Sequence, residues 1–438
     1  MKSDTRLLTL KILTQFEKNN KQLGIIRNHL FSQYKPDTLV RSRVMALSNE
    51  IIRFRGRLDF LIEKISSRSI KRLNNSLRSI LHIGFYEILY DEVIPDYAAV
   101  NSCVDLTKNI LNRKASGLTN AVLRKLIREK EANKDWNLQY KKDTRWDSIP
   151  AWLQLKWKDQ FGDDGYHGLI KKFNRVSSTF IRNDHYQYSM NELINKFKRN
   201  EIDCEKYSKN FLKVNSGVRK VISTELFQSG HISIQDPASG AVVDCLDPIE
   251  GETILDVCAS PGTKSLYLSS LVGENGKIYS SDIDPDRVKK GKLDIKRHKR
   301  KNIYWSVKDA TINKYNQTDK ILVDAPCSGT GVIGRKPDIR WRRKPNDILQ
   351  FASLQLKILC NMAHYLKTGG TLVYATCSLE TEENWNVVEQ FLKLNTKFLL
   401  DRVPSTIPSK WIDRNGCLNT SPHVDGVDGM FAARLKHL

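Results

Sequence analysis

Residues 252–265, ETILDVCASPGTKS, decide the fold. The run ETILDV combines β-branched and apolar residues and predicts a short buried strand. Small residues end this strand, and the segment that follows, SLYLSSL, has the character of a helix. Such a turn lets backbone N–H groups approach a ligand near the positive end of the helix. The stretch is neither a P-loop nor a G-x-G-x-x-G fingerprint, and by itself it also suits an ordinary strand-to-helix turn.

Four further β-rich runs follow downstream, separated by helical or loop segments. They are KIYSSDI (277–283), NIYWSV (302–307), KILVDA (320–325) and GTLVYAT (370–376). Alternation of apolar strands and helices predicts an α/β fold with a doubly wound, Rossmann-like parallel sheet. Ligands of such sheets bind beyond the carboxyl ends of the strands.

The chain before this sheet has a different pattern. Residues 4–130 carry apolar side chains every three or four positions, which predicts an all-α bundle with turns at Pro95 and Gly117. Residues 131–148 are polar and predict a linker, and the mixed segment after them predicts a small α/β module. The predicted domains are a helical domain at 1–135, a small α/β linking subdomain at 145–232 and a Rossmann-like domain at 233–438.

The charge balance points to a polyanionic partner. The chain has 71 Lys and Arg against 49 Asp and Glu, a net charge of +22. Residues 1–135 hold 25 basic and 14 acidic residues, a net of +11 and half of the excess. Such a basic chain binds nucleic acid favourably, because its Lys and Arg side chains neutralise phosphates and release the counterions bound to them. No strongly apolar-faced basic helix, membrane-spanning stretch or secretory signal is evident, so we expect a cytoplasmic protein without a membrane partner.

The eight cysteines form no recognisable metal or disulfide pattern. No two of them are closer than 13 residues, so there is no C-x-x-C pair with zinc-ligand spacing. Disulfides are unexpected in a long cytosolic chain. We therefore predict no metal, and we expect most of the cysteines to be small buried apolar residues.

Acidic residues stand at the ends of successive predicted strands. Asp282 follows Asp256 by 26 residues, the approximate spacing of a ribose-binding acid in nucleoside-binding sheets. Asp284 is close enough to be an alternative, and Asp309 follows the next strand, where it could meet an adenine edge. Each could be a solvated turn aspartate, but together they favour a nucleoside cofactor.

Two cysteines also follow neighbouring strands. Cys327 lies in DAPCSGTG (324–331), three residues after Asp324, and Cys377 lies in YATCS (374–378). Either thiol alone is more readily explained by burial than by catalysis. Two thiols and an acid at adjacent strand ends, beside a nucleoside pocket, indicate covalent chemistry.

These motifs resemble the RNA 5-methylcytosine methyltransferases that use S-adenosylmethionine. ILDVCASPGTKS is similar to their cofactor loop, DAPCSGTG and YATCS to their fourth and sixth motifs, and RKPDIRW and DGVDGMFAARL to later segments. The helical region resembles the antitermination factor NusB, notably in YAAVNSCVDLTK and GLTNAVLRKL. The combination resembles the RsmB (Sun/Fmu) family of bacterial 16S ribosomal RNA (cytosine-5-)-methyltransferases, over nearly the whole chain.

The resemblance implies a role for each candidate residue. Cys377 would attack carbon 6 of the cytosine, Cys327 would assist release of the carbon 5 proton, and Asp324 would bind the N3 edge. The implied S-adenosylmethionine site comprises Cys258, Ala259, Ser260, Pro261, Gly262, Thr263, Lys264, Asp282, Asp309 and Asp324. The implied RNA contacts are Arg335, Lys336 and Arg340, with a flipped base of 16S ribosomal RNA, or of an assembly intermediate, as substrate for a monomeric enzyme.

One departure and two alternatives accompany this reading. The family's loop usually reads Cys-Ala-Ala-Pro-Gly-Gly-Lys, whereas this chain has Ser260 and Thr263, and a β-branched Thr263 could hinder a close backbone approach. A transfer RNA cytosine-5 methyltransferase is the nearest alternative, and the NusB-like region argues against it. A non-catalytic RNA-binding assembly factor is the other, and the retained cysteines argue against that.

Overall fold

The computed structural model describes residues 4–133, 135–184 and 187–438. Contacts divide the chain into two units. The first comprises Met1–Arg175 with Ile333–Arg343, and the second comprises Val176–Val332 with Lys344–Leu438. The division falls inside the predicted 145–232 subdomain: its helical start joins the first unit and its strands join the second. The boundaries 1–135, 145–232 and 233–438 stay a prediction.

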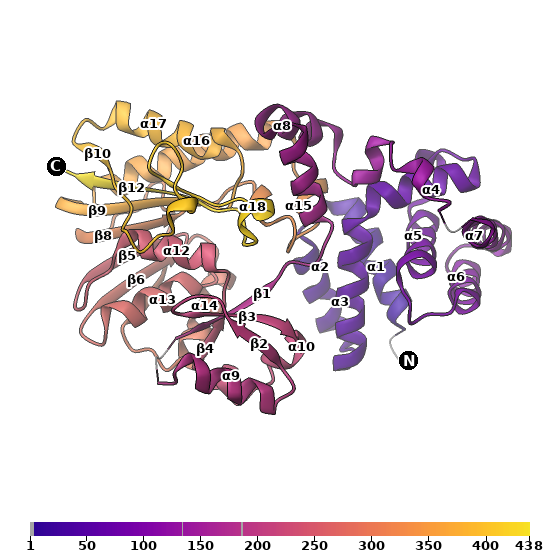
Figure 1. The fold of residues 1–438 in the computed structure, drawn as a ribbon, viewed down its shortest axis with the longest axis horizontal. Helices are drawn as coiled ribbons and strands as arrows, with labels where there is room; N and C mark the ends of the chain where they lie inside the picture. Colours follow the sequence, from indigo (N-terminus) through magenta and orange to yellow (C-terminus); the bar gives the residue numbers. More distant parts are fainter. Residues whose placement is uncertain (1–3, 134, 185–186) are drawn as a thin grey trace. The chain divides into compact units, whose positions relative to one another are not determined.

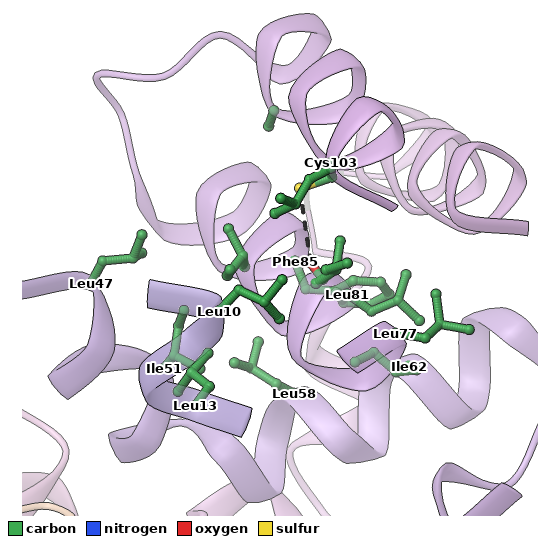
Figure 2. Close-up of a cluster of buried hydrophobic side chains, with 14 of the residues drawn as sticks. Leu10, Leu13, Leu47, Ile51, Leu58, Ile62, Leu77, Leu81, Phe85 and Cys103 are labelled. Atoms are coloured by element: carbon green, nitrogen blue, oxygen red, sulfur yellow. Dashed lines mark hydrogen bonds between the residues drawn. The ribbon is translucent and has the colours of Figure 1, made fainter. Parts of the chain in front are cut away.

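The first unit is helical, as the apolar spacing predicts. Its main helices are α1 (Thr5–Asn19), α2 (Leu23–Tyr34), α3 (Thr38–Arg53), α4 (Arg55–Ser66), α5 (Asn75–Tyr90), α6 (Asp96–Ile110), α7 (Arg113–Ala132), α8 (Ala151–Phe173) and the short α15 (Ile339–Arg342). Figure 2 shows buried Leu10, Ile51, Leu58 and Phe85 filling the space between helices. Burial of these apolar side chains is the main stabilising term of the bundle.

Two details of the first unit correct the predictions. Gly117 lies inside α7 and marks no turn, whereas Pro95 does precede α6. The polar segment after α7 is more than a linker, because Trp136 is 7% exposed and packs in the helical core. Its neighbourhood is held by short 3₁₀ turns at Leu138–Tyr140 and Thr144–Asp147.

The second unit begins with a small antiparallel sheet. Its strands are β1 (Thr179–Asn183), β2 (Asp203–Lys206), β3 (Phe211–Ser216) and β4 (Ile232–Ile234), in the order β2-β3-β1-β4. Helix α9 (Met190–Arg199) covers it and starts at a capping box of Ser189 and Glu192, and short α10 (Val218–Val221) and α11 (Glu225–Gln228) follow β3. The segment thus contains the strands and the helix expected of a small α/β module.

A larger sheet follows, with the order β10-β12-β9-β8-β5-β6-β7 and β11 paired to β12. Its strands are β5 (Thr253–Val257), β6 (Lys277–Asp282), β7 (Ile303–Val307), β8 (Thr318–Asp324), β9 (Leu366–Thr376), β10 (Phe398–Asp401), β11 (Leu418–Asn419) and β12 (Phe431–His437). Strands β5 to β9 are parallel neighbours, as predicted, whereas β12 runs antiparallel to both β9 and β10. The sheet is therefore mixed, because the C-terminal strands return beside β9.

Helices cover both faces of the large sheet (Figure 1). On one face lie α12 (Pro237–Leu246), α13 (Thr263–Val272) and α14 (Pro285–Arg297), and on the other lie α16 (Pro345–Ala363) and α17 (Trp385–Leu394). Two buried apolar clusters, one on each face, join the helices to the sheet. A short α18 (Pro422–Asp425) precedes β12. Within the part of the chain that the structure describes, no helix has the length and apolarity to cross a bilayer.

A buried histidine in the second unit predicts a pH dependence of stability. Burial of its ring lowers the pKa of His298 to about 4. The carboxylates of Asp184 and Asp294 oppose the shift, and the guanidinium groups of Arg297 and Arg182 add to it. The ordinary pKa is 6.5, so between these values the unfolded chain binds a proton that the folded chain does not. The free energy of unfolding is therefore unaffected by His298 above pH 6.5, and it decreases as the pH drops from 6.5 towards 4.

We expect His298 to remove up to about 3 kcal/mol from the free energy of unfolding across this window. Urea titrations at several pH values measure the loss, and His298→Gln supplies the comparison because it does not titrate. Equal pH slopes in the wild type and the variant would contradict the assignment.

Candidate active site

The predicted cofactor loop connects β5 to α13 at the carboxyl end of the sheet. The N–H of Ala259 donates to the Ser281 carbonyl at 2.9 Å, which ties the loop to neighbouring β6. Gly262 ends the loop with φ +105°, and a Cβ there would lie 2.9 Å from the Trp305 ring. Only glycine suits this position, because the angle is left-handed and the ring occupies the space.

The loop is framed by buried acids. Asp256 is fully buried at the end of β5, and its Oδ2 accepts a 2.5 Å hydrogen bond from Ser265. Burial raises the pKa of Asp256 to about 7, against the effect of that hydrogen bond, and the Asp324 charge raises it further. A cation beside the loop would favour the ionised form of this carboxyl.

The two candidate acids at the end of β6, Asp282 and Asp284, make different contacts. Asp282 is 2% exposed, and its carboxylate accepts hydrogen bonds from the Ser260 N–H at 3.3 Å and the Asp284 N–H at 3.1 Å. Asp284 instead caps α14, accepting from the N–H groups of Asp286 and Arg287. Asp282 is thus fixed against the loop, which favours it over Asp284 as the ribose partner.

Asp309 follows β7 and is half-buried. Its Oδ1 accepts from both the N–H and the hydroxyl of Thr311, at 2.9 and 2.7 Å. One carboxylate oxygen therefore stabilises the local turn, and the other remains as the candidate for an adenine amino group.

Lys264 and Asp324 form an ion pair at the end of β8. The Lys264 Nζ donates to Asp324 Oδ2 at 2.7 Å. Burial acts to lower the pKa of Lys264, but the Asp324 carboxylate and its hydrogen bond overcome this and raise it above the ordinary value. The lysine therefore stays charged and fixes the acid, rather than reaching into solvent.

The two cysteines of the predicted site lie together. The Sγ atoms of Cys327 and Cys377 are 3.3 Å apart. The Gly331 N–H donates to the Cys377 carbonyl at 3.0 Å, and a Cβ on Gly331 would collide with the Gly429 carbonyl oxygen. The hydrogen bond to Cys377, with burial, raises the pKa of Cys327 well above its ordinary value. Cys327 is therefore a thiol at neutral pH, and it lies within hydrogen-bond distance of the Cys377 sulfur, where either sulfur can be the donor.

One buried residue that supports both cysteines was not among the predicted site residues. Glu383 accepts from the Ser328 N–H at 2.8 Å, the Ser378 hydroxyl at 2.7 Å and the Gln355 amide at 2.9 Å. Ser328 follows Cys327 in the chain and Ser378 follows Cys377. One carboxylate thus connects the two cysteine loops. The signal in the sequence is the acidic run ETEEN, which reads only as a helix start.

The predicted RNA contacts need one correction. Lys336 is exposed and Arg335 is half-exposed, but Arg340 is fully buried in the first unit. Its guanidinium donates to the carbonyls of Arg53, Ser148 and Phe173 and to the Asn174 side chain, at 2.9 to 3.1 Å. The prediction that Arg340 contacts RNA is therefore wrong, because its charge holds backbone segments together.

The described residues offer no metal site. Among them, no group of three or more His, Cys, Asp or Glu side chains could hold a metal ion.

Two families match the chain. The NusB family matches residues 3–128, and the family described as 16S rRNA methyltransferase RsmB/F matches residues 243–436. Residues 129–242 lie between the two matches.

Relatives match the chain nearly from end to end. The probable ribosomal RNA small subunit methyltransferase B of Bacillus subtilis (strain 168) is 30% identical over 99% of this chain and 99% of its own length. The ribosomal RNA small subunit methyltransferase B of Photorhabdus laumondii is 30% identical over 99% of this chain and 98% of its own. The crystal structure of PH0851 covers 100% of this chain and 99% of its own, with a TM-score of 0.80 and 25% identity.

Fold and matches together define an α/β methyltransferase domain preceded by a NusB-like helical region. The chain belongs to the RsmB family, the ribosomal RNA small subunit methyltransferases B. This confirms the resemblance carried by the loop and cysteine motifs.

Thr263 stands where the loop of the family usually has a glycine. Thr263 is the first residue of α13 and is absent from the residues with positive φ, so its backbone needs no glycine. We expect Thr263→Gly to lower the free energy of unfolding by about 0.5 kcal/mol through backbone entropy. The dissociation constant for S-adenosylmethionine should change less than about threefold, since the backbone geometry is already helical. Calorimetric titration measures this constant, and a tenfold tighter variant would show that the threonine obstructs the loop.

Proposed function

We propose that the protein transfers a methyl group from S-adenosylmethionine to carbon 5 of a cytosine in small-subunit (16S) ribosomal RNA. The observation that carries the proposal is the pair of Cys327 and Cys377 sulfur atoms, 3.3 Å apart at neighbouring strand ends. Family membership supports the RNA substrate, since the relatives are named for small-subunit ribosomal RNA.

The residues around the loop suit this cofactor chemically. S-adenosylmethionine carries a sulfonium and an ammonium, and Asp256 offers a buried Oδ1 without a hydrogen-bond partner among the described residues. Asp282 would hold the ribose hydroxyls, and the free oxygen of Asp309 would hold the adenine edge. The backbone of residues 258–264 would face the methionine part. When bound, the cofactor supplies the methyl group as an electrophile.

The protein's own residues then have to activate the base. Carbon 5 of cytosine is a poor nucleophile, so a Cys377 thiolate adds to carbon 6 and makes the ring enamine-like. Asp324 is bound by Lys264 through Oδ2, which leaves Oδ1 to accept a hydrogen bond at the N3 edge of the cytosine, from N3 once it is protonated in the adduct. This contact orients the ring and stabilises the adduct.

The second cysteine serves the release step. Once carbon 5 carries the methyl group, its proton leaves and the electrons of that C–H bond expel the Cys377 sulfur from carbon 6. Cys327 assists this release. Cys327 first loses its own proton to water. Because its pKa is raised, the thiolate is then a strong base that takes the carbon 5 proton, and Cys377 leaves carbon 6 as a thiolate. Separate sulfurs for attack and release let each have the protonation state that its step needs.

The RNA must present an unstacked cytosine, since neither thiol can reach a base inside a helix. Lys336 and Arg335 remain candidates for phosphate contacts, and the net charge of +11 over residues 1–135 supports a polyanion there.

The test is to incubate wild-type protein with methyl-labelled S-adenosylmethionine and separately with small-subunit ribosomal RNA, large-subunit ribosomal RNA and transfer RNA. Digestion to nucleosides and chromatography identify the labelled base. We expect label in 5-methylcytidine from the small-subunit RNA. Label mainly in transfer RNA would support the transfer RNA enzyme instead. RNA binding without label in any RNA would support a non-catalytic assembly factor.

A further inference from the structure

The small sheet β2-β3-β1-β4 lies outside both family matches, yet it carries a buried charge network that reaches the cofactor loop. Arg182 of β1 is 0% exposed and Asp184 is 1% exposed. A buried ion pair contributes little net stability, because desolvation of both charges offsets their attraction. Such a pair is therefore better explained by what it holds in place.

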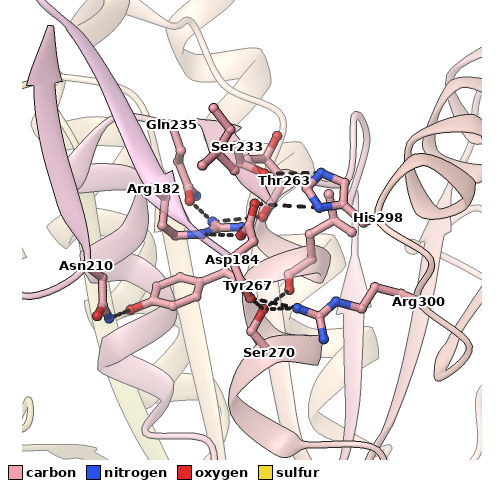
Figure 3. A network of polar contacts seen from close by, with 12 residues as sticks. Arg182, Asp184, Asn210, Ser233, Gln235, Thr263, Tyr267, Ser270, His298 and Arg300 are labelled. Atoms are coloured by element: carbon pink, nitrogen blue, oxygen red, sulfur yellow. Dashed lines mark hydrogen bonds and ion pairs between the residues drawn. The ribbon is translucent and has the colours of Figure 1, made fainter. Parts of the chain in front are cut away.

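Figure 3 shows what the Arg182 guanidinium holds. It donates to Asp184 Oδ1 through Nε at 2.7 Å, to Gln235 Oε1, and to the Thr263 carbonyl at 3.2 Å. The guanidinium also lies 4.4 Å from the centre of the Tyr267 ring. One side chain of the small sheet thus contacts both the first residue of α13 and the Tyr267 ring, about one turn further along the helix.

A second set of contacts fixes Asp184 to the same helix and to the end of α14. Its carbonyl accepts from the Ser270 hydroxyl at 2.9 Å and from Arg300 at 2.7 Å. Its carboxylate lies 3.6 Å from the His298 ring. Because Asp184 is anchored on both sides, the guanidinium that it binds has a fixed position.

The first turn of α13 is therefore bound residue by residue from three different elements. Arg182 of β1 binds the Thr263 carbonyl, Asp324 of β8 binds the Lys264 ammonium, and Asp256 of β5 binds the Ser265 hydroxyl. The last two partners belong to the Rossmann-like sheet, and only Arg182 comes from the small sheet.

We infer that Arg182 is a positioning residue for the cofactor loop. The small sheet holds Arg182 in place, because the residue belongs to strand β1. The inference rests on the proposed function, because the ligand of the loop is taken to be S-adenosylmethionine. A loop held in its binding conformation loses less entropy on binding than a loop that must be ordered by the ligand. Loss of the Arg182 contact therefore weakens the cofactor complex and spares the chemistry at the cysteines.

The test compares Arg182→Lys and Arg182→Met with Tyr267→Phe. Lysine keeps the charge opposite Asp184 but cannot span Gln235 and Thr263 together. Tyr267→Phe keeps the ring beneath the guanidinium and removes only the hydroxyl, which bonds to Asp244 at 2.8 Å and Asn210 at 3.2 Å. It is the matched control, because it also disturbs buried hydrogen bonds but leaves the Thr263 contact intact.

We expect both Arg182 variants to raise the dissociation constant and the KM for S-adenosylmethionine about tenfold or more. The kcat at saturating cofactor and RNA should stay within about threefold, because Cys327 and Cys377 are untouched. The control should lose thermal stability with an unchanged cofactor affinity. Unchanged affinity in folded Arg182→Lys, or an equal loss in Tyr267→Phe, would overturn the inference and leave a purely structural role.

Two further measurements distinguish a failure of the inference about Arg182 from a failure of the proposed function. If neither Arg182 variant folds, Gln235→Met removes one acceptor of the guanidinium, and it must weaken cofactor binding about threefold or more for the inference to stand. A wild-type protein that binds no S-adenosylmethionine would contradict the proposed function itself, not the role of Arg182 within it.

Discussion

Cys327→Ala is expected to accumulate a covalent complex between the protein and small-subunit ribosomal RNA, whereas Cys377→Ala is expected to form none. The attacking sulfur must be retained for a bond to carbon 6 to form. Without Cys327, the adduct forms and is methylated, but release of the carbon 5 proton fails and the Cys377 sulfur stays bound. The short Sγ–Sγ distance of 3.3 Å makes this division of labour possible at a single base.

A denaturing gel of each protein incubated with the RNA and S-adenosylmethionine detects the complex as a slowly migrating band. Methylation should fall by at least about 10³-fold in Cys377→Ala, because covalent activation of the ring is lost. Cys360→Ala is the matched control, since Cys360 is a half-buried thiol of α16 outside the site. A band in Cys377→Ala and none in Cys327→Ala would show that the roles of the two cysteines are exchanged. Full methylation activity in both variants would contradict the two-thiol mechanism.

The sequence predicts the parallel part of the sheet because each strand carries its own local signal. Runs such as KILVDA need only an apolar, β-branched pattern and flanking turns, and all five predicted strands are present. The same locality explains the loop and both cysteine motifs, since each motif lies at the end of a strand. Because β8 and β9 are parallel and adjacent, the segments that carry Cys327 and Cys377 lie at the same edge of the sheet.

The errors involve contacts between residues far apart in the chain. Arg340 reads as an exposed cation beside other arginines, yet its partners Arg53, Ser148 and Phe173 lie about 170 to 290 positions away. Gly117 is a different kind of error. Its low helix propensity predicted a turn, but a glycine is tolerated inside a helix when tertiary packing stabilises that helix. Neither outcome can be inferred from neighbouring residues.

Glu383 lies in an acidic run that is easily noticed in the sequence, but its three hydrogen-bond partners cannot be read from that run. Glu383→Ala is expected to lower the free energy of unfolding of the second unit by about 3 to 5 kcal/mol. The reason is that the Ser328 N–H, the Ser378 hydroxyl and the Gln355 amide would lose their common acceptor in a buried place. A cavity in place of the carboxylate adds to the loss.

The same substitution should also impair catalysis in any protein that still folds. Glu383 connects the residues that directly follow the two cysteines, so its loss loosens the two loops, which then keep the Gly331 N–H bond to the Cys377 carbonyl and the contact between the Ser328 and Ser378 hydroxyls. A displacement of about 1 Å in a catalytic group can cost about 10²-fold in rate. We expect a fall of this size in kcat for Glu383→Ala, with little change in the cofactor affinity. Urea unfolding and steady-state methylation measure the two effects.

Glu383→Gln distinguishes the need for a charge from the need for an acceptor. Burial raises the pKa of Glu383, although its hydrogen bonds oppose the shift. An amide can place its oxygen towards Ser328 and Gln355 and its nitrogen towards the Ser378 hydroxyl, which then acts as an acceptor. We therefore expect Glu383→Gln to cost less than about 1.5 kcal/mol and to retain most of the activity. If the glutamine variant is as damaged as the alanine variant, the negative charge itself is required, and Glu383 acts on the cysteines electrostatically rather than by holding their loops.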